Sequence, residues 1–217
     1  MFKNTLVALL GAAAILAQPV SHAQNTGAQT KSMSKSSFSA QSNLRSDMRK
    51  LWEEHVSYTR NFITSSLAGL EDTDAVTQRL LKNQDDIGSA VKPIYGDTAG
   101  NKLGALLRDH ILIAAEIAKA AKAGNNDAVG TGKAKGRANA DDIARLLTGA
   151  NSNWSQQQLS DMLYKHLDYV IAQVTSRLKK DWAADIDAND RGREHMLMFA
   201  DILTSGIVKQ FPKKFPR

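Results

Sequence analysis

Residues 44–67 read LRSDMRKLWEEHVSYTRNFITSSL, and their apolar side chains recur every three or four positions. This spacing places them on one face of an α-helix, because a helix completes a turn in about 3.6 residues. The imidazole of His55 falls on the same stripe, between Trp52 and Phe62. The segment therefore predicts a long amphipathic helix with a histidine on its buried face.

The same helical period recurs along the rest of the chain, and no segment alternates apolar and polar residues as a strand would. The further helices that it predicts are 74–92, 97–122, 139–148, 155–182 and 191–210. Pro93 and Gly96 predict a turn between the first two of these, because proline restricts the residue before it. The glycine-rich segment 124–137 is predicted to be a surface loop, and residues 185–190 a bend or a break.

These elements predict an all-α fold, an antiparallel bundle of four long helices with two short connecting helices. The bundle domain is expected to span residues 43–211. Residues 24–42 are mostly Gln, Ser, Thr, Lys, Gly and Ala. They predict a flexible leader, because such a segment buries too little apolar surface to offset its conformational entropy. Residues 212–217 form a short basic tail.

The N-terminal residues have the layout of a secretory signal peptide. Lys3 precedes an apolar run from Thr5 to Leu16, and small residues stand at Ser21 and Ala23. We expect cleavage after Ala23, hence a signal peptide of residues 1–23 and a periplasmic or secreted mature chain. The apolar run is shorter than the roughly 20 residues that cross a bilayer, and no later stretch is long enough. A membrane-spanning protein is therefore not expected.

The composition excludes several kinds of chemistry. The chain has no cysteine, so disulfides, thiolate metal sites and cysteine nucleophiles are ruled out. Its formal net charge of +6 comes from basic residues spread among acidic ones. For an exported protein this pattern does not indicate nucleic-acid binding. The basic tail is instead a candidate for weak contact with anionic surfaces.

Four histidines follow the signal peptide, one on each predicted long helix: His55, His110, His166 and His195. Each shares a helix face with large side chains three or four positions further on, so each imidazole is expected to point inward. Neutral imidazole is the commonest protein ligand for transition metals, and bundle cores accommodate such sites. The four histidines therefore predict a site for a divalent transition metal. Residues that are candidates for hydrogen bonds to these histidine ligands, which would fix the orientation of the rings, are Glu116, Asp201, Tyr58 and Tyr169.

Three functions are compatible with this pattern. An exported binding protein is favoured, because the chain lacks the histidine and glutamate motifs of metalloproteases and di-iron bundles, and no serine lies in a nucleophile elbow. A ligand-free structural or interaction bundle is the first alternative, with core histidines that only form hydrogen bonds. A metal-dependent enzyme is the second alternative, and it needs a solvent-open mouth with a vacant coordination position. The sequence identifies no catalytic residue.

Seven short motifs run through the bundle domain. They are Leu51-Trp-x-x-His55-Val-x-Tyr-Thr-Arg60, Asn83-Gln-x-Asp-Ile-Gly88, Pro93-x-Tyr-Gly-x-x-Ala-Gly100, His110-Ile-x-Ile-Ala-x-Glu116, Asn139-Ala-Asp-Asp-Ile-Ala144, His195-x-Leu-Met-x-Ala-Asp-x-Leu203 and Gly206-Ile-Val-Lys-Gln-Phe-Pro212. With them the chain resembles a family of small, uncharacterised, exported, all-helical bacterial proteins, over about Leu44 to Phe215. Some members carry a glycosyltransferase label. The chain offers no physical support for that activity, because nucleotide-sugar transfer normally uses an α/β sheet to hold the diphosphate.

Overall fold

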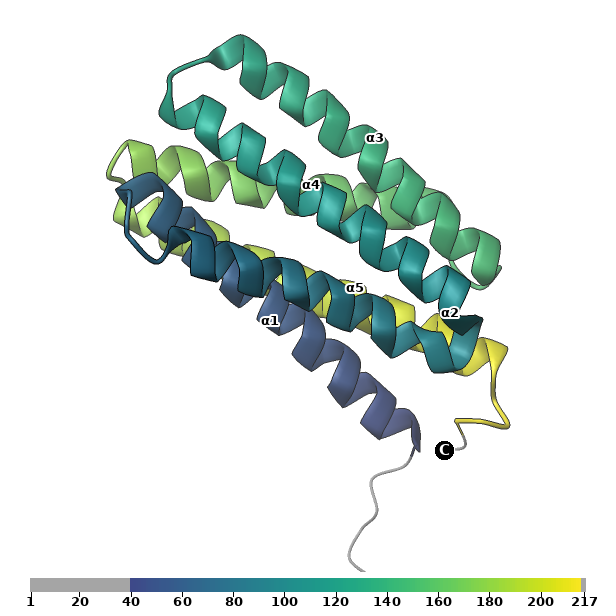
Figure 1. Cartoon of the computed structure of the whole chain (residues 1–217). Coiled ribbons are helices and arrows are strands. Elements are labelled where there is room, and N and C mark those ends of the chain that lie inside the picture. Colours follow the sequence, from purple (N-terminus) through teal and green to yellow (C-terminus); the bar gives the residue numbers. More distant parts are fainter. Residues whose placement is uncertain (1–39, 216–217) are drawn as a thin grey trace, which may run out of the picture. The chain divides into compact units, whose positions relative to one another are not determined.

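The computed structural model describes residues 40–215, which are helical almost throughout. Its five helices are α1 (Ala40–Ala68), α2 (Thr73–Lys122), α3 (Asn126–Ala150), α4 (Gln156–Leu178) and α5 (Trp182–Gln210). Each helix packs against the next one in the sequence, and α1 also packs against α5 (Figure 1). Between residues 40 and 215 there is no strand, so the predicted all-α class is confirmed.

The long helix α2 reverses direction at Gly96 and therefore consists of two arms, residues 73–95 and 97–122 (Figure 1). Gly96 has φ 84° and ψ 166°, a conformation that is open to glycine but strained for a residue with a Cβ. Pro93 lacks an N–H group and so weakens the helix just before the reversal. The break predicted between Pro93 and Gly96 is thus confirmed, and the first arm extends slightly past the proline.

Three glycines allow the two arms of α2 to touch. A Cβ built on Gly88 would lie 2.6 Å from the carbonyl oxygen of Gly100 and 3.0 Å from Cα of Gly104. In one straight helix twelve residues rise about 18 Å, so this contact exists only because the chain turns back. Close by, the Arg108 guanidinium donates a hydrogen bond of 3.2 Å to the Asp85 carboxylate across the two arms.

Replacing Gly88 by alanine is expected to lower the free energy of unfolding by about 1–3 kcal/mol, because the new methyl group would meet backbone atoms that have nowhere to move. The matched control is Gly149→Ala in α3, where an added Cβ meets no atom within 4 Å. That substitution should instead stabilise the protein by about 0.4–1 kcal/mol. Urea unfolding of the two variants measures both values, and equal effects would contradict the tight contact.

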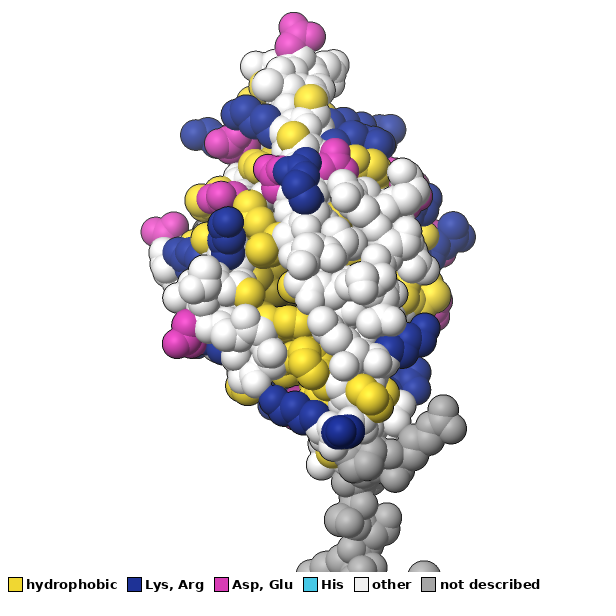
Figure 2. Space-filling model, turned by 90° about the vertical axis from the view of Figure 1, so that its right-hand side faces the viewer, with side chains coloured by type: hydrophobic (Ala, Val, Ile, Leu, Met, Phe, Trp, Pro, Cys, Tyr) yellow, Lys and Arg dark blue, Asp and Glu magenta, His cyan; other side chains and the backbone are white. Residues whose placement is uncertain are grey.

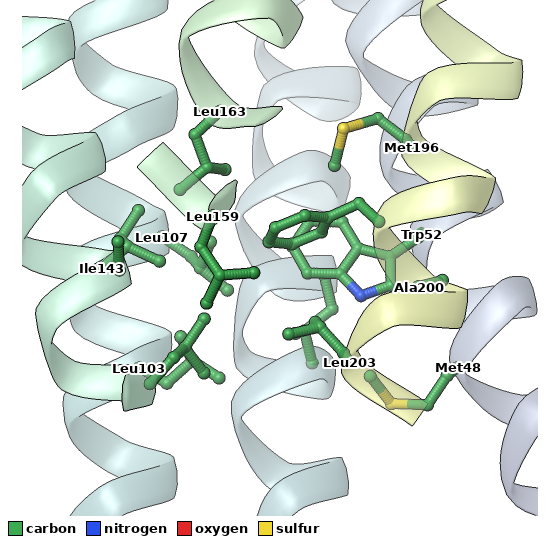
Figure 3. Close-up of a cluster of buried hydrophobic side chains, with 14 of the residues drawn as sticks. Met48, Trp52, Leu103, Leu107, Ile143, Leu159, Leu163, Met196, Ala200 and Leu203 are labelled. Carbon is green, nitrogen blue, oxygen red and sulfur yellow. The ribbon is translucent and has the colours of Figure 1, made fainter. Parts of the chain in front are cut away.

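The largest apolar cluster draws side chains from all five helices (Figure 3). Trp52 lies at its centre, 2% exposed, with its indole edge-on to the Phe199 ring at 5.0 Å. The members labelled in Figure 3 are Met48, Trp52, Leu103, Leu107, Ile143, Leu159, Leu163, Met196, Ala200 and Leu203. Burial of each large apolar side chain contributes about 1.5–3 kcal/mol, so this cluster is a major source of stability.

The predicted surface loop at 124–137 is wrong, because α3 begins at Asn126 and includes most of that segment. The glycines there serve helix packing instead of a turn. A Cβ on Gly132, for example, would lie 2.5 Å from the side chain of Ile117. This close packing outweighs the low helix propensity of glycine. The short helix predicted at 139–148 is the C-terminal part of this longer helix.

The junction between the last two helices also differs from the prediction. Helix α4 ends at Leu178, and α5 begins at Trp182 instead of Arg191. Lys180 has φ 59°, in the left-handed region, and so ends α4. The Asp181 side chain then caps α5 by accepting a hydrogen bond of 3.1 Å from a backbone N–H of its first turn. Trp182, the last residue of the predicted helix 155–182, is instead the first residue of α5 and is 53% exposed.

The predicted signal peptide, residues 1–23, and most of the predicted leader lie outside the described residues. Residues 40–42, also assigned to the leader, form the first turn of α1. None of the helices between residues 40 and 215 has both the length and the apolar character needed to cross a membrane.

Charged side chains of both signs surround a strip of apolar side chains on the face drawn in Figure 2.

Part of the predicted basic tail, residues 212–217, is docked on the bundle. Phe211 and Phe215 pack against the first apolar cluster. The Lys214 ammonium donates a hydrogen bond of 2.8 Å to the backbone carbonyl of Pro93. The segment therefore covers the turn between the two arms of α2, and only its last two residues lie outside the description.

Candidate functional site

A layer of buried polar side chains divides the core into two apolar clusters. The first is the cluster of Figure 3, and the second consists of Phe62, Ile63, Leu80, Leu81, Ile111, Ala118, Val170 and Val174. On α1, on both arms of α2 and on α4, buried polar residues lie at the level where one cluster gives way to the other. We call the following residues, each at most 8% exposed, the polar layer: His55, Asn83, Gln84, His110, Asn139, His166 and His195.

Three of the four predicted histidines meet in this layer. The centre of the His166 ring lies 5.2 Å from that of His55 and 6.1 Å from that of His110, on which it stacks at 23°. The His195 ring instead stands edge-on to Tyr169 at 5.7 Å. The structure thus brings together His55, His110 and His166, from α1, α2 and α4, and leaves His195 at the margin of the layer.

His55 and His166 are in direct contact through their ring nitrogens. Their Nε2 atoms lie 3.2 Å apart, so one nitrogen donates and the other accepts. Nδ1 of His55 lies 3.3 Å from the amide nitrogen of Gln84, which also donates to the Leu80 carbonyl at 2.9 Å and to Oδ1 of Asn83 at 3.1 Å. The other ring nitrogen of His166 is Nδ1. It is buried and has no hydrogen-bond partner among the described residues.

The hydrogen bonds of His110 leave its Nε2 atom without a proton. Nδ1 of His110 lies 2.9 Å from the side-chain oxygen of Asn139, to which it donates. The Asn139 amide in turn donates to the backbone carbonyl of Leu106 at 3.0 Å, which fixes its orientation. A neutral imidazole held in this way presents a free lone pair at Nε2, and this is the tautomer that many metal-binding histidines adopt.

Burial keeps these imidazoles neutral. It lowers the pKa of His55 to about 3, with a further contribution from a charge on His110 and some opposition from the Gln84 hydrogen bond. Burial also lowers the pKa of His110, against the hydrogen bond to Asn139. The pKa of His166 is lowered well below 6.5 by burial and then by charge on the other three histidines. Neutral imidazole is the form that binds metal ions.

Several other buried polar atoms have no hydrogen-bond partner within residues 40–215. They include Oγ1 of Thr59, Oε1 of Gln84 and Oε1 of Gln173. Thr59 lies one helical turn after His55, and Gln173 two turns after His166, so they share the helix faces of the polar layer. An orphaned polar atom in a core costs about 1–3 kcal/mol. Of these three atoms, only Oε1 of Gln84 belongs to the polar layer itself.

The side chains predicted to support the ligands lie in different places. Glu116 is exposed and forms an ion pair with a lysine at 3.2 Å, and Asp201 forms one with an arginine at 2.8 Å. Neither carboxylate belongs to the polar layer. Tyr58 stacks under an arginine at 4.1 Å, whereas Tyr169 does contact His195. Among residues 40–215, no group of three or more histidine or acidic side chains is arranged to hold a metal ion.

The amide residues of the layer were missed by the sequence prediction. Asn83 and Gln84 begin the polar run Asn83-Gln-Asp-Asp86, which composition alone would place in solvent, yet both are 0% exposed. The Asn83 amide donates to the backbone carbonyl of Leu51 at 3.1 Å. A usable signal was present, because Gln84 lies four residues after Leu80 and three before Ile87, on the apolar face of the first arm of α2.

A second buried polar group fastens α5 to its neighbours. The Asp185 carboxylate, 2% exposed, accepts two hydrogen bonds from Arg60 of α1, at 3.1 and 3.0 Å, and one from Arg177 of α4, at 2.8 Å. The two guanidinium groups are partly exposed, at 27% and 19%. This carboxylate therefore ties α1, α4 and α5 together.

Comparisons with protein-family models, with curated proteins and with solved structures found no match to this chain. The resemblance to a family of exported helical proteins therefore stays a prediction.

Proposed function

We propose that this chain is an exported, non-enzymatic binding protein, an antiparallel helical bundle whose polar layer holds a divalent transition metal ion. The mature chain would act in the periplasm or outside the cell after cleavage near Ala23. The observation that carries the proposal is the contact between Nε2 of His55 and Nε2 of His166, which lie 3.2 Å apart in the core.

This distance is close to one edge of a tetrahedral metal site. With metal–nitrogen bonds of about 2.0–2.1 Å, two imidazole nitrogens of a tetrahedral zinc site lie about 3.3–3.4 Å apart. The Nε2 atoms of His55 and His166 would thus need little movement to share an ion. For both Nε2 atoms to bind the ion, each neutral ring would have to carry its proton on Nδ1. At Nδ1 of His55 this proton would face the side-chain amide of Gln84, whose Oε1 lacks a partner in the described part of the chain.

His110 is the candidate for a third ligand. Its ring stacks on that of His166, and the hydrogen bond to Asn139 leaves a free lone pair on Nε2. A partner of this kind behind a ligand is usual in metal sites, because it fixes the orientation of the ring. A set of imidazoles without carboxylates favours Zn²⁺, Cu²⁺, Ni²⁺ or Fe²⁺ over Mg²⁺ and Ca²⁺.

Purification of the mature chain without a histidine tag tests the proposal, followed by mass spectrometry for bound metal and thermal shifts with each of these four ions. We expect His166→Gln to weaken metal affinity by more than about 100-fold. Substitution of a residue that only hydrogen-bonds a metal ligand typically costs about 10- to 100-fold. The matched control is His195→Gln, the same substitution at the margin of the layer, and it should leave the equilibrium affinity nearly unchanged. A metal-free wild type with no thermal shift would reject the proposal.

The alternative is a ligand-free structural or interaction bundle, and the hydrogen bonds of the histidines favour it. His55 bonds to Gln84, His110 to Asn139, and His195 to a backbone carbonyl at 2.8 Å. In that case each His→Gln variant would change stability while no metal affinity exists to lose. A metal-dependent enzyme has less support, because the three clustered rings are at most 5% exposed and offer no open coordination position to a substrate.

A further inference from the structure

A surface hollow of about 620 Å³ lies over the margin of the polar layer, beside the first turns of α4. Its lining consists of Ser155, Gln157, Gln158, Asp161, Met162 and His195. Of the four histidines, His195 is the most exposed, at 8%. One wall of this hollow is therefore an imidazole that also belongs to the polar layer.

Only a short distance along α4 separates the hollow from the clustered rings. Nε2 of His195 donates to the backbone carbonyl of Met162 at 2.8 Å. Met162 lies four residues before His166, so the two side chains share one face of the helix, a single turn apart. His195 is thus fixed at the level of Met162, which lines the hollow one helical turn before His166.

The lining of the hollow suits the capture of a transition-metal ion. It offers an imidazole, a thioether, a carboxylate and amide oxygens, and none of its six side chains is a lysine or an arginine. The Asp161 carboxylate is exposed and attracts cations, while Gln157 orients it through a hydrogen bond of 2.9 Å. Met162 is partly buried. Its unbranched side chain can change rotamer at little cost, so it can move aside to let an ion pass.

We infer that this hollow is the access site of the buried histidines, where His195 and Asp161 make the first contact with a divalent metal ion before it passes Met162 to reach His166 and His55. The inference rests on the proposed function for the identity of the solute. The route itself would serve any small solute that reaches the clustered rings from solvent.

The test blocks the hollow and follows two independent readouts. Gln158, an exposed lining residue, is replaced by tryptophan. The first readout is the rate of Zn²⁺ uptake, followed by competition with a chromophoric chelator. The second is hydrogen–deuterium exchange at the imidazole carbon of His166 and His55, measured by mass spectrometry, which needs no metal. We expect both rates to fall at least tenfold while the metal content at equilibrium stays the same.

The matched control is Ser57→Trp, in another surface hollow that no histidine lines. It should leave both rates unchanged. A second variant, Asp161→Lys on the exposed side of α4, should slow Zn²⁺ uptake but not imidazole exchange, because it changes charge without closing the route. If Gln158→Trp does not fold, the rate of Zn²⁺ uptake by Asp161→Lys still tests whether the ion enters through this hollow.

The outcomes separate the two proposals. If the wild type takes up no metal, the proposed function fails, and imidazole exchange alone decides whether the hollow is the route. Slower exchange in Gln158→Trp than in Ser57→Trp supports the route. Equal rates in both variants overturn it, whether or not metal binds.

Discussion

Acidification from pH 7.0 to pH 4.5 is expected to lower the free energy of unfolding of the metal-free protein by about 3 kcal/mol or more. Burial holds the pKa of His55 at about 3, so the folded state takes up no proton there. In the unfolded chain a histidine titrates near about 6.5. The unfolded state therefore gains protons first, and the stability that is fully present above about pH 6.5 is lost as the pH falls. His110 and His166, whose pKa values are lowered by the same burial, add to this loss.

Urea unfolding of chelator-treated protein at closely spaced pH values measures the effect. Each buried neutral histidine adds up to about 1.4 kcal/mol per pH unit to the slope of the unfolding free energy against pH. The substitution His55→Gln should remove the contribution of one histidine from that slope. Hydrogen bonds and nearby arginines lower the pKa values of Asp141 and Asp201, and the stability that this contributes is lost mainly below the unfolded value of about 3.9, outside this range. A free energy of unfolding that stays level down to pH 4.5 would show that the rings accept protons in the native state.

Replacing Asp185 by alanine is expected to cost about 3 kcal/mol, and about 6–12 °C in the melting temperature of a chain of this size. The substitution leaves two partly buried guanidinium groups, those of Arg60 and Arg177, without their anion. It also unties α5 from α1 and α4. Calorimetry or thermal unfolding followed by circular dichroism measures the shift.

Asp201→Ala is the matched control, because Asp201 also lies on α5 and also pairs with two arginines. There, however, the arginine side chains are 56% and 42% exposed. Surface ion pairs of this kind contribute about 0–1 kcal/mol, so the control should shift the melting temperature by only a few degrees. If the two variants lose the same stability, burial does not decide the strength of these pairs.

The inward direction of the histidines could be predicted from the sequence because it depends only on helical spacing. His55, His110 and His166 are buried as their neighbours on the apolar stripes predict. The reversal at Gly96 was also accessible, since a proline followed closely by a glycine is a strong local signal. Whether imidazoles from separate helices meet depends on how the helices align, and spacing within one helix does not contain that information.

The missed features share one physical cause, which is that tertiary packing overrides local preference. Gly132 looks like a loop residue until Ile117 is seen to occupy the space of its absent side chain. Asn83 and Gln84 look solvated until the opposing backbone and His55 are in place to bind them. In both cases the deciding partner is distant in sequence or lies on another segment, so composition alone favoured the wrong answer.

The polar layer also has a consequence for how the chain selects one native arrangement. Two purely apolar cores would tolerate one helix sliding past its neighbours by a turn, because leucine can replace leucine at little cost. A slide of α1 by one turn would carry His55 away from both Gln84 and His166 and bury an imidazole against hydrocarbon, without a partner. The histidines therefore fix the register of the helices relative to one another, because shifted alignments leave a buried imidazole without a partner, whether or not an ion is bound.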